Sequence, residues 1–519
     1  MSAQQKDLGR IQKWFKAALK DQQLGRPALA EKTYLKILKV QPRHAGVLVN
    51  LAIVQGRQGK LEKARESALR ATTTDPKLAA GHTVLGAAFI QLGQFAAAIK
   101  ACRVALSLNQ TDQSVLPMMG AAYKALGQFC DAEKCFRQVL GDTITDISAV
   151  GNLSSVLVDQ GKYQEAKTLL DQQINKTPNV ASLWNTLGNI HSSLADHDAA
   201  MAAYQQAITI DRFFPDALYN LSLLHLVAGQ LSKAWPGFEK RLDLFGNDQT
   251  FNSFKQAQWD GMPVTDGCLL ICAEQGLGDT LQFIRYAVLA KKRVGRIILI
   301  CQPPLKNYLK RMEELDAVVA FGDPLPDFDF YIPILSLPQI FTPDLPSIPN
   351  LIPYLPIPDI TKGEPGKTIK VGLNWAGSET NPNDHRRSTT LDVFKPLLDI
   401  PNCRFFSLQF GGRGNDIKDL GLSTVIEDLR PQLDGFKNTA DTIQTLDLVI
   451  SVCTSLAHLT GGIGRPVWVL LNHDADWRWF KNRDDSPWYP TARLFRQPTP
   501  GDWQDVIRNV HQALSTLTL

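Results

Sequence analysis

The chain lacks the features that mark a secreted, membrane-spanning or metal-binding protein. Its eight cysteines are scattered over 519 residues, with no CxxC pair and no Cys/His cluster at zinc-finger spacing. No apolar run reaches the 18 residues or so that a membrane-spanning helix needs. The first twenty residues are polar and have no apolar segment of the secretory type. From these absences we expect a cytoplasmic protein without a bound metal.

Strong charge of either sign is also missing. The formal net charge is +4, and neither basic clusters nor interleaved basic and aromatic residues occur, so a nucleic-acid binder has little support. The apolar fraction of 44% and the charged fraction of 20% are those of a folded protein. A chain of 519 residues is too long for one core, and three or more domains are expected.

The first half of the chain repeats with a period of 34 residues. A small residue in each repeat lets two antiparallel helices approach, a glycine ends the first helix, and a bulky residue fills the gap between hairpins. The glycine position is occupied by Gly25, Gly59, Gly93, Gly127, Gly161, Ala195 and Gly229. The small position is occupied by Ala18, Ala52, Gly86, Gly120, Ser154, Gly188 and Ser222, and the bulky one includes Tyr34, Phe136, Tyr204 and Phe238.

Over residues 11–244 this pattern resembles the tetratricopeptide-repeat (TPR) family, with about seven repeats. Such arrays are binding scaffolds, so we expect a protein or peptide partner on the concave face. Asparagines that fall inside the first helices of several repeats suggest a groove for a peptide backbone, although packing explains most repeat residues. They are Asn50, Asn152, Asn185, Asn189 and Asn220.

After Phe245 the helical period ends, and short apolar runs alternate with amphipathic stretches. This alternation predicts parallel sheets with helical crossovers, in two blocks separated by the proline-rich stretch 343–360. Strands are predicted at 268–273, 296–301, 318–321, 330–334, 369–375, 403–409, 448–452 and 467–471, and helices at 280–292, 391–398, 439–446 and 455–463. The predicted fold class is α + α/β multidomain: a TPR solenoid at 1–245, and Rossmann-like domains at 246–365 and 366–519.

Four segments of the second half carry a more specific resemblance: EQGLGDTLQFIR, VGLNWAG, HRRSTTLDVF and SVCTSLAHLTGGIGRPVWVLL. Together, over residues 259–516, they resemble the heptosyltransferase family of inverting, metal-independent glycosyltransferases. The overall plan is also similar to that of the O-linked N-acetylglucosamine transferases. The resemblance implies a GT-B module, with the acceptor on the 246–365 side, a nucleotide-sugar donor on the 366–519 side, and no cofactor.

The EQGLGD segment supplies the candidate base. Gly276 and Gly278 allow a sharp turn from strand to helix, and Asp279 falls at the start of the helix. The resemblance implies that Asp279 accepts the proton of the acceptor hydroxyl. A capping role at the helix start is the alternative, and the two roles are compatible.

Two further segments supply candidate donor contacts. Arg387, with Ser388 beside it, lies seven residues before Phe394, where the resemblance implies a cation for the leaving diphosphate. A solvated charge pair is the alternative for Arg387. Thr454 and Ser455 begin a helix directly after a strand, which suits a diphosphate.

His458, one turn into this helix, is either a contact of a ribose or sugar hydroxyl or a structural bridge. Cys453 stands where the resembled family usually has an acidic residue, and a thiol does not replace a carboxylate as a hydrogen-bond acceptor. For the aromatic residues Trp477, Trp479, Trp488 and Tyr489, core packing is favoured over stacking on a sugar.

The leading hypothesis is a glycosyltransferase whose acceptor the repeats recruit. The alternative is a TPR scaffold with a catalytically silent nucleotide-sugar-binding module.

Overall fold

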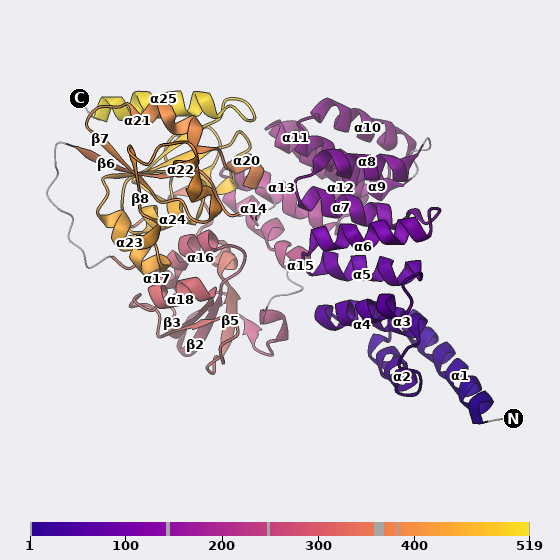
Figure 1. The fold of residues 1–519 in the computed structure, drawn as a ribbon. Coiled ribbons are helices and arrows are strands. Elements are labelled where there is room, and N and C mark those ends of the chain that lie inside the picture. The colour runs from indigo at the N-terminus through magenta and orange to yellow at the C-terminus, as the bar shows by residue number, and fades with distance from the viewer. Residues whose placement is uncertain are drawn as a thin grey trace. The chain divides into compact units, whose positions relative to one another are not determined.

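The computed structural model describes residues 3–141, 146–245, 250–357, 368–379, 381 and 384–517. The chain divides into two compact units, Met1–Ile190 and His191–Leu519, coloured from indigo to yellow along the sequence in Figure 1. The described part of the first unit is helical throughout, and the second unit contains the last helices of the repeats and two sheets. A helical TPR solenoid therefore precedes a region of parallel sheets.

The first unit is a succession of helical hairpins, and the unit boundary falls within α11. Its helices are α1 (Ala3–Gln23), α2 (Pro27–Val40), α3 (Ala45–Arg57), α4 (Leu61–Thr74), α5 (Ala79–Gln91), α6 (Phe95–Leu108), η1 (Gln113–Val115), α7 (Leu116–Ala125), α8 (Phe129–Leu140), α9 (Ile147–Asp159), α10 (Tyr163–Lys176) and α11 (Ala181–Ser193). The predicted helical hairpins are confirmed, with Pro42, Pro76 and Pro178 just after α2, α4 and α10.

Close helix packing explains the small positions of the repeat. A Cβ atom on Gly120 of α7 would lie 2.6 Å from the ring of Phe136 on α8, and one on Gly86 of α5 would lie 2.6 Å from Sγ of Cys102 on α6. Both contacts join a small position to the bulky position sixteen residues later. The predicted close approach of two antiparallel helices at the small position is confirmed here, and the residue at the bulky position meets it within the same hairpin.

The glycine position of the repeat ends the first helix of a hairpin in a left-handed conformation. The six glycines at this position have φ between 68° and 75°. Ala195, which takes the place of the missing glycine, adopts the same conformation with φ 55°. The turn geometry is therefore kept where its preferred residue is absent, at a cost of about 1 kcal/mol for a residue with a Cβ atom.

The second unit begins with helices and continues into alternating strands and helices. The longer helices are α12 (His197–Ile210), α13 (Pro215–Val227), α14 (Leu231–Phe238), α15 (Arg241–Phe245), α16 (Leu277–Phe283), α18 (Pro303–Leu309), α19 (Leu337–Phe341), α23 (Gly435–Gln444), α24 (Ser455–Gly462) and α25 (Trp503–Leu517). Single turns form α17 (Ala287–Ala290), α20 (Asp384–Arg387), α21 (Lys395–Leu398), α22 (Asp416–Asp419), η3 (Thr250–Ser253), η4 (Ile284–Tyr286), η5 (Ile334–Ser336), η6 (Leu345–Ser347), η7 (Leu391–Phe394), η8 (Gly412–Asn415), η9 (Arg430–Gln432) and η10 (Trp477–Trp479).

The strands form two parallel sheets. The first contains β1 (Ala257–Gln258), β2 (Val264–Cys272), β3 (Val294–Cys301), β4 (Ala317–Ala320) and β5 (Phe330–Pro333), in the order β1-β5-β2-β3-β4. The second contains β6 (Ile369–Asn374), β7 (Cys403–Ser407), β8 (Ile426–Asp428), β9 (Leu448–Val452), β10 (Val467–Leu471) and β11 (Ala492–Arg496), in the order β11-β10-β9-β6-β7-β8. All strand pairs of the two sheets are parallel, as predicted.

The last hairpin of the repeats shares a core with both sheets. Trp235 of α14 donates through Nε1 to the carbonyl of Thr342 at 2.7 Å, and its ring lies 6.1 Å from that of Trp477. Phe238 belongs to the same cluster of buried residues. Residues 191–245, which the sequence analysis assigned to the repeat domain, thus belong to the second unit. Among the described residues, no helix combines the length and apolar character needed to cross a membrane.

Candidate functional site

A pocket lies at the carboxyl ends of β6, β7 and β9. Its volume is about 410 Å³, and it is lined by residues from the segments 374–379, 409–413 and 454–456 together with Phe436. Leu277, the first residue of α16 beside the first sheet, also lines it. Ligands of parallel α/β sheets bind at this edge, so this pocket is the candidate functional site.

Hydrogen bonds among Asn374, Gln409 and Thr454 fix the floor of the pocket. The Oε1 atom of Gln409 accepts from the backbone N–H groups of residues 375 and 376, at 3.0 and 2.9 Å, and from Nδ2 of Asn374 at 2.8 Å. The Oδ1 atom of Asn374 accepts from the hydroxyl of Thr454 at 3.1 Å. The hydroxyl of Thr454 is thus engaged within the protein, and the loops after β6, β7 and β9 are joined.

The first residues of α24 line the pocket. Thr454 is the N-cap residue, without a side-chain cap, and Ser455 and Leu456 follow it at the pocket wall. The first N–H groups of a helix have no partner within the helix and attract anions. The structure therefore brings the predicted residues Thr454 and Ser455 to the pocket in a geometry that suits a phosphate group.

Arg387 and Ser388 lie against the loop that forms one wall of the pocket. A Cβ atom on Gly377 would lie 2.6 Å from Nη2 of Arg387 and 2.6 Å from Oδ1 of Asp384, so these two side chains lie directly against the backbone of this loop. The Gly377 N–H donates to Oγ of Ser388 at 2.9 Å. Arg387 also pairs with Asp384, Nε to Oδ1 at 3.3 Å, and its side chain is 26% exposed. Arg387 is thus next to the pocket, as a contact with the leaving diphosphate requires, and it is also paired with a carboxylate, as the charge-pair alternative predicts.

Asp279 is the third residue of α16 and caps its start. The backbone N–H of Gly276 donates to its Oδ2 at 2.8 Å, and Nη2 of Arg478 donates to its Oδ1. Burial raises the pKa of Asp279, while the charge of Arg478 opposes this shift. The capping role is therefore present, and both carboxylate oxygens accept hydrogen bonds. The role of Asp279 as a base stays a prediction.

The two glycines of this segment differ in their roles: Gly276 has an extended backbone, and Gly278 allows close packing of two helices. Gly276 has φ −88°, and the left-handed residue of the turn is instead Gln275, with φ 59°. A Cβ atom on Gly278 would lie 2.9 Å from Cδ2 of His458 and 3.5 Å from Cα of Ser455. Gly278 therefore permits α16 to approach α24, which brings the Asp279 segment to the pocket region.

His458 occupies the packed space between these helices. Its Nδ1 lies 2.9 Å from the hydroxyl of Tyr489, and its ring stacks on Trp479 with centroids 5.5 Å apart. Burial, reinforced by Arg478, lowers the pKa of His458 to about 3, so the ring is neutral. This environment favours the structural-bridge reading, and the sugar contact of His458 stays a prediction.

Arg478 and Asp476 were not foreseen from the sequence. Arg478 is buried and donates through Nη1 to both oxygens of Asp476, at 2.9 and 3.1 Å, while its Nη2 contacts Asp279. The side chain of Asp476 is 41% exposed, and Arg478 lowers its pKa against the effect of burial. One cation thus joins two carboxylates. The only local signal was the Asp-x-Arg spacing within an aromatic segment.

Cys453 lies in the same cluster. Its Sγ accepts from Nε1 of Trp479 at 3.1 Å, and burial together with Asp476 raises its thiol pKa to about 11. The thiol is therefore neutral near pH 7. The surrounding aromatic residues are buried, with Trp479, Trp488 and Tyr489 at 0% exposure, which confirms the packing interpretation.

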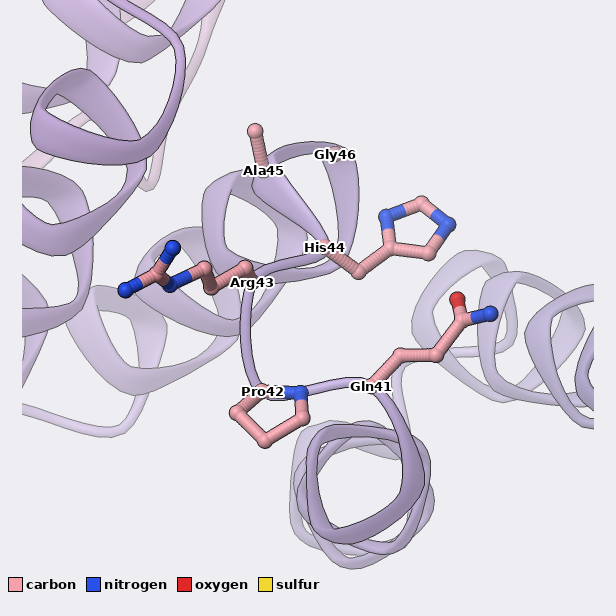
Figure 2. Close-up of a pocket in the computed structure, with 6 residues that line it drawn as sticks. All are labelled: Gln41, Pro42, Arg43, His44, Ala45 and Gly46. Atoms are coloured by element: carbon pink, nitrogen blue, oxygen red, sulfur yellow. The ribbon is translucent and has the colours of Figure 1, made fainter.

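A second hollow, of about 680 Å³, runs along Gln41–Gly46 between α2 and α3 (Figure 2). The side chains of Gln41 and His44 extend to one side and that of Arg43 to the other. His44 is the N-cap of α3, and its Nδ1 accepts from Val47 N–H at 3.3 Å. The polar groups do not converge, so this hollow is a weaker candidate. In the described residues no cluster of three or more His, Cys, Asp or Glu side chains could hold a metal ion.

Comparisons with known proteins agree with the repeat assignment. Two tetratricopeptide-repeat family models match, one at residues 181–214 and the other at 15–79 and 50–113. The curated protein FlbA of Caulobacter vibrioides is 22% identical over 415 residues, which cover 67% of this chain and 69% of FlbA.

Two solved structures of TPR proteins are also similar. A protein from Parabacteroides merdae is 19% identical, with 46% of this chain and 94% of that chain covered and a TM-score of 0.42. YrrB, described as a TPR protein with an unusual peptide-binding site, is 18% identical, with coverages of 36% and 96% and a TM-score of 0.30. The first half of the chain thus carries TPR repeats, a scaffold of the kind that binds proteins or peptides.

Proposed function

We propose that the protein is a metal-independent, inverting glycosyltransferase of the GT-B type, which transfers a sugar from a nucleotide-sugar donor to an acceptor recruited by the repeats. The observation that carries the proposal is the pocket at the carboxyl ends of β6, β7 and β9, with the start of α24 in its wall. A cytoplasmic location forms part of the proposal, because all eight cysteines are unpaired.

The donor would bind with its diphosphate at the start of α24. The N–H groups of Ser455 and Leu456 would donate hydrogen bonds to phosphate oxygens. The cation of Arg413 lies in the pocket wall, and that of Arg387 lies next to it. Arg413 lines the pocket and donates through Nη2 to the carbonyl of Thr389 at 2.8 Å. These groups would stabilise the negative charge that grows on the leaving diphosphate.

Asp279 would act on the acceptor. The acceptor oxygen forms a bond to the anomeric carbon, the bond from that carbon to the diphosphate breaks, and the hydroxyl proton passes to the carboxylate. The carboxylate of Asp279 offers about four lone-pair sites, so it can accept from the acceptor hydroxyl beside its contacts with Gly276 and Arg478.

The test is calorimetric titration of the full chain with UDP, GDP, ADP and CMP, followed by mass spectrometry of mixtures with the matching nucleotide sugars. We expect one nucleotide to bind, and its sugar donor to be hydrolysed or transferred. Arg404→Ala is a suitable control variant, because Arg404 pairs with Glu427 at an exposed site at the second sheet. Absence of binding across the panel would contradict the proposal.

A second candidate is a protein-interaction scaffold with a silent nucleotide-sugar-binding module. Two observations favour it: both oxygens of Asp279 are engaged, and residue 453 is a neutral thiol. This candidate predicts nucleotide binding without sugar transfer or hydrolysis. The same panel of donors therefore separates the two functions.

A further inference from the structure

A buried arginine at the end of the repeats holds the loop that carries Asp279. Arg241, the first residue of α15, is 1% exposed. Its Nε donates to Oε2 of Glu274 at 3.0 Å, and its Nη2 donates to Oε1 at 2.9 Å. Glu274 follows the end of β2 and begins the segment that reaches Asp279. A helix of the repeats and the candidate base are thus linked through one ion pair.

The remaining polar atoms around this ion pair are also engaged. Nη1 of Arg241 donates to Glu239, and Nη2 donates to Oγ of Ser336 at 2.7 Å. The backbone N–H of Leu335 donates to Oε1 of Glu274 at 3.0 Å. Burying such a pair costs desolvation energy that its attraction offsets only in part. Its clearer effect is geometric, because a bidentate guanidinium fixes both the position and the plane of the carboxylate.

The residue after Glu274 adopts an unfavourable backbone conformation. Gln275 has φ 59°, and its carbonyl accepts from Nε2 of Gln302 at 3.2 Å. A non-glycine residue in the left-handed region costs about 1 kcal/mol and persists only where its surroundings hold it. Glu274 is held on one side of Gln275, and Asp279 is held by Gly276 and Arg478 on the other. The strained turn therefore lies between two anchors.

We propose that Arg241 is a positioning residue for Asp279. By fixing Glu274 it holds the turn at Gln275 and, through that turn, the start of α16. The role given to Asp279 rests on the proposed function, whereas the anchoring of the loop does not. The helix α15 is accordingly a part of the functional site as well as the end of the repeats.

The experiment compares hydrogen exchange in the wild-type chain and in two arginine-to-lysine variants. Arg241→Lys keeps a positive charge but loses the bidentate contact. Arg293→Lys is the matched control, because Arg293 is a partly buried arginine of the same sheet region, which donates to the carbonyl of Gly261 and lies over Phe341. For Arg241→Lys we expect exchange in residues 274–283 to rise about tenfold, while β3 keeps its protection. Arg293→Lys should leave the exchange of 274–283 as in the wild type.

A second variant breaks the same ion pair from its other side, so that the test remains possible if Arg241→Lys does not fold. Glu274→Gln removes the charge but keeps an oxygen for Leu335 N–H, and it should give the same local rise in exchange. Unchanged exchange in 274–283 for both variants, or an equal rise throughout the second unit, would overturn the inference.

Activity gives a further readout with a donor that the wild type uses. Arg241→Lys should lower kcat about tenfold or more with an unchanged donor Kd, because displacing a reacting group by about 1 Å can cost ~10² in rate. An unchanged kcat would overturn the positioning role. If the wild type uses no donor, the proposed function fails, and the exchange experiment still decides whether Arg241 anchors the loop.

Discussion

Arg478 donates a hydrogen bond through Nη2 to Oδ1 of Asp279, across 199 positions of sequence. Asp279 belongs to the helix that follows β2 of the first sheet, and Arg478 lies in a turn after β10 of the second. The candidate base, which follows a strand of the first sheet, is therefore held by a cation that follows a strand of the second sheet. Any change at Asp279 acts on this contact as well as on the chemistry.

Asp279→Asn should leave donor binding unchanged and lower turnover about 10²-fold or more, because an amide does not accept the acceptor proton. One amide hydrogen would then face either Arg478 or the Gly276 N–H, so a small loss of stability is also expected. Turnover and calorimetry on the same preparation measure the two effects. Equal turnover in variant and wild type would exclude Asp279 as the base.

The pH profile provides an independent check. Burial raises the pKa of Asp279 above its ordinary value of 3.8, although Arg478 opposes this. The base works only when deprotonated, so kcat/KM should fall as pH falls through this raised pKa. The acid limb of the wild-type profile should therefore lie above pH 3.8.

Arg387→Ala should weaken nucleoside-diphosphate binding about 10-fold while a nucleoside without phosphate binds as before, because a charge-assisted contact contributes ~1.5–3 kcal/mol at most. The partial neutralisation of Arg387 by Asp384 places the effect at the low end of that range. Arg404→Ala serves as control, since its exposed pair with Glu427 joins neighbouring strands. Calorimetric titration measures both variants, and an equal Kd for Arg387→Ala and the wild type would remove Arg387 from the site.

Gly120→Ala should destabilise the repeats by about 1–3 kcal/mol, because the new Cβ would lie 2.6 Å from the Phe136 ring. Gly151→Ala, inside α9, is the matched control, since its Cβ would meet only Oγ1 of Thr186, at 3.8 Å. That variant should gain about 0.5–1 kcal/mol from the better helix propensity of alanine. Urea unfolding of both variants measures the difference, and the double change Gly120→Ala/Phe136→Leu should recover part of the loss.

Acid should weaken the repeats through Glu133. Burial alone would raise the pKa of this carboxyl, but hydrogen bonds from Lys162, Arg137 and Gln160 outweigh it and lower the pKa to about 2. Because the folded pKa lies below the unfolded value of about 4.5, the stabilisation is present above pH 4.5 and is lost as pH falls toward 2. Glu133→Gln should reduce the pH dependence of unfolding in this range, with a cost of about 1–2 kcal/mol at pH 7. If the free energies of unfolding of the wild type and of the variant change equally with pH, this role of Glu133 is contradicted.

The repeats could be predicted from sequence because their period reports packing directly. Gly120 and Phe136 stand sixteen residues apart in a frame that recurs, and the contact between them is the reason for the frame. The strands were predicted from apolar runs, whereas β1, β8 and β11 were missed, since short or mixed segments carry a weak periodic signal. Among the longer helices α18, α19 and α25 were also missed, although α25 has an amphipathic pattern over 15 residues. The predicted helix at 280–292 is divided into α16, η4 and α17.

Sequence could predict those parts of the candidate site whose position depends on neighbouring residues in the chain. Thr454 and Ser455 follow a strand and begin a helix, which places them at the carboxyl edge of a sheet. Arg478 and Arg241 were missed, because each acts on a residue that only the tertiary fold brings near. His458 was predicted one turn into α24, but its burial against Tyr489 depends on a segment 31 residues away.

Cys453→Asp tests whether the lost carboxylate limits the activity of the module. The wild-type thiol is neutral near pH 7 and accepts a weak hydrogen bond from Nε1 of Trp479. An aspartate would keep this partner, with the charges of Arg387 and Arg478 in its favour and that of Asp476 against it. We expect donor turnover to rise about fivefold or more, as a charged hydrogen bond contributes ~1.5–3 kcal/mol.

Cys453→Asn is the matched control, because it has nearly the same shape as aspartate without the charge. It should leave turnover close to that of the wild type. Both are measured as donor hydrolysis and transfer with the nucleotide that binds, beside thermal unfolding to confirm the fold. A rise with aspartate from an inactive wild type would support the silent-module function, and a rise from an active one would show that Cys453 only limits the rate. No change with aspartate would mean that the site works without a carboxylate at this position.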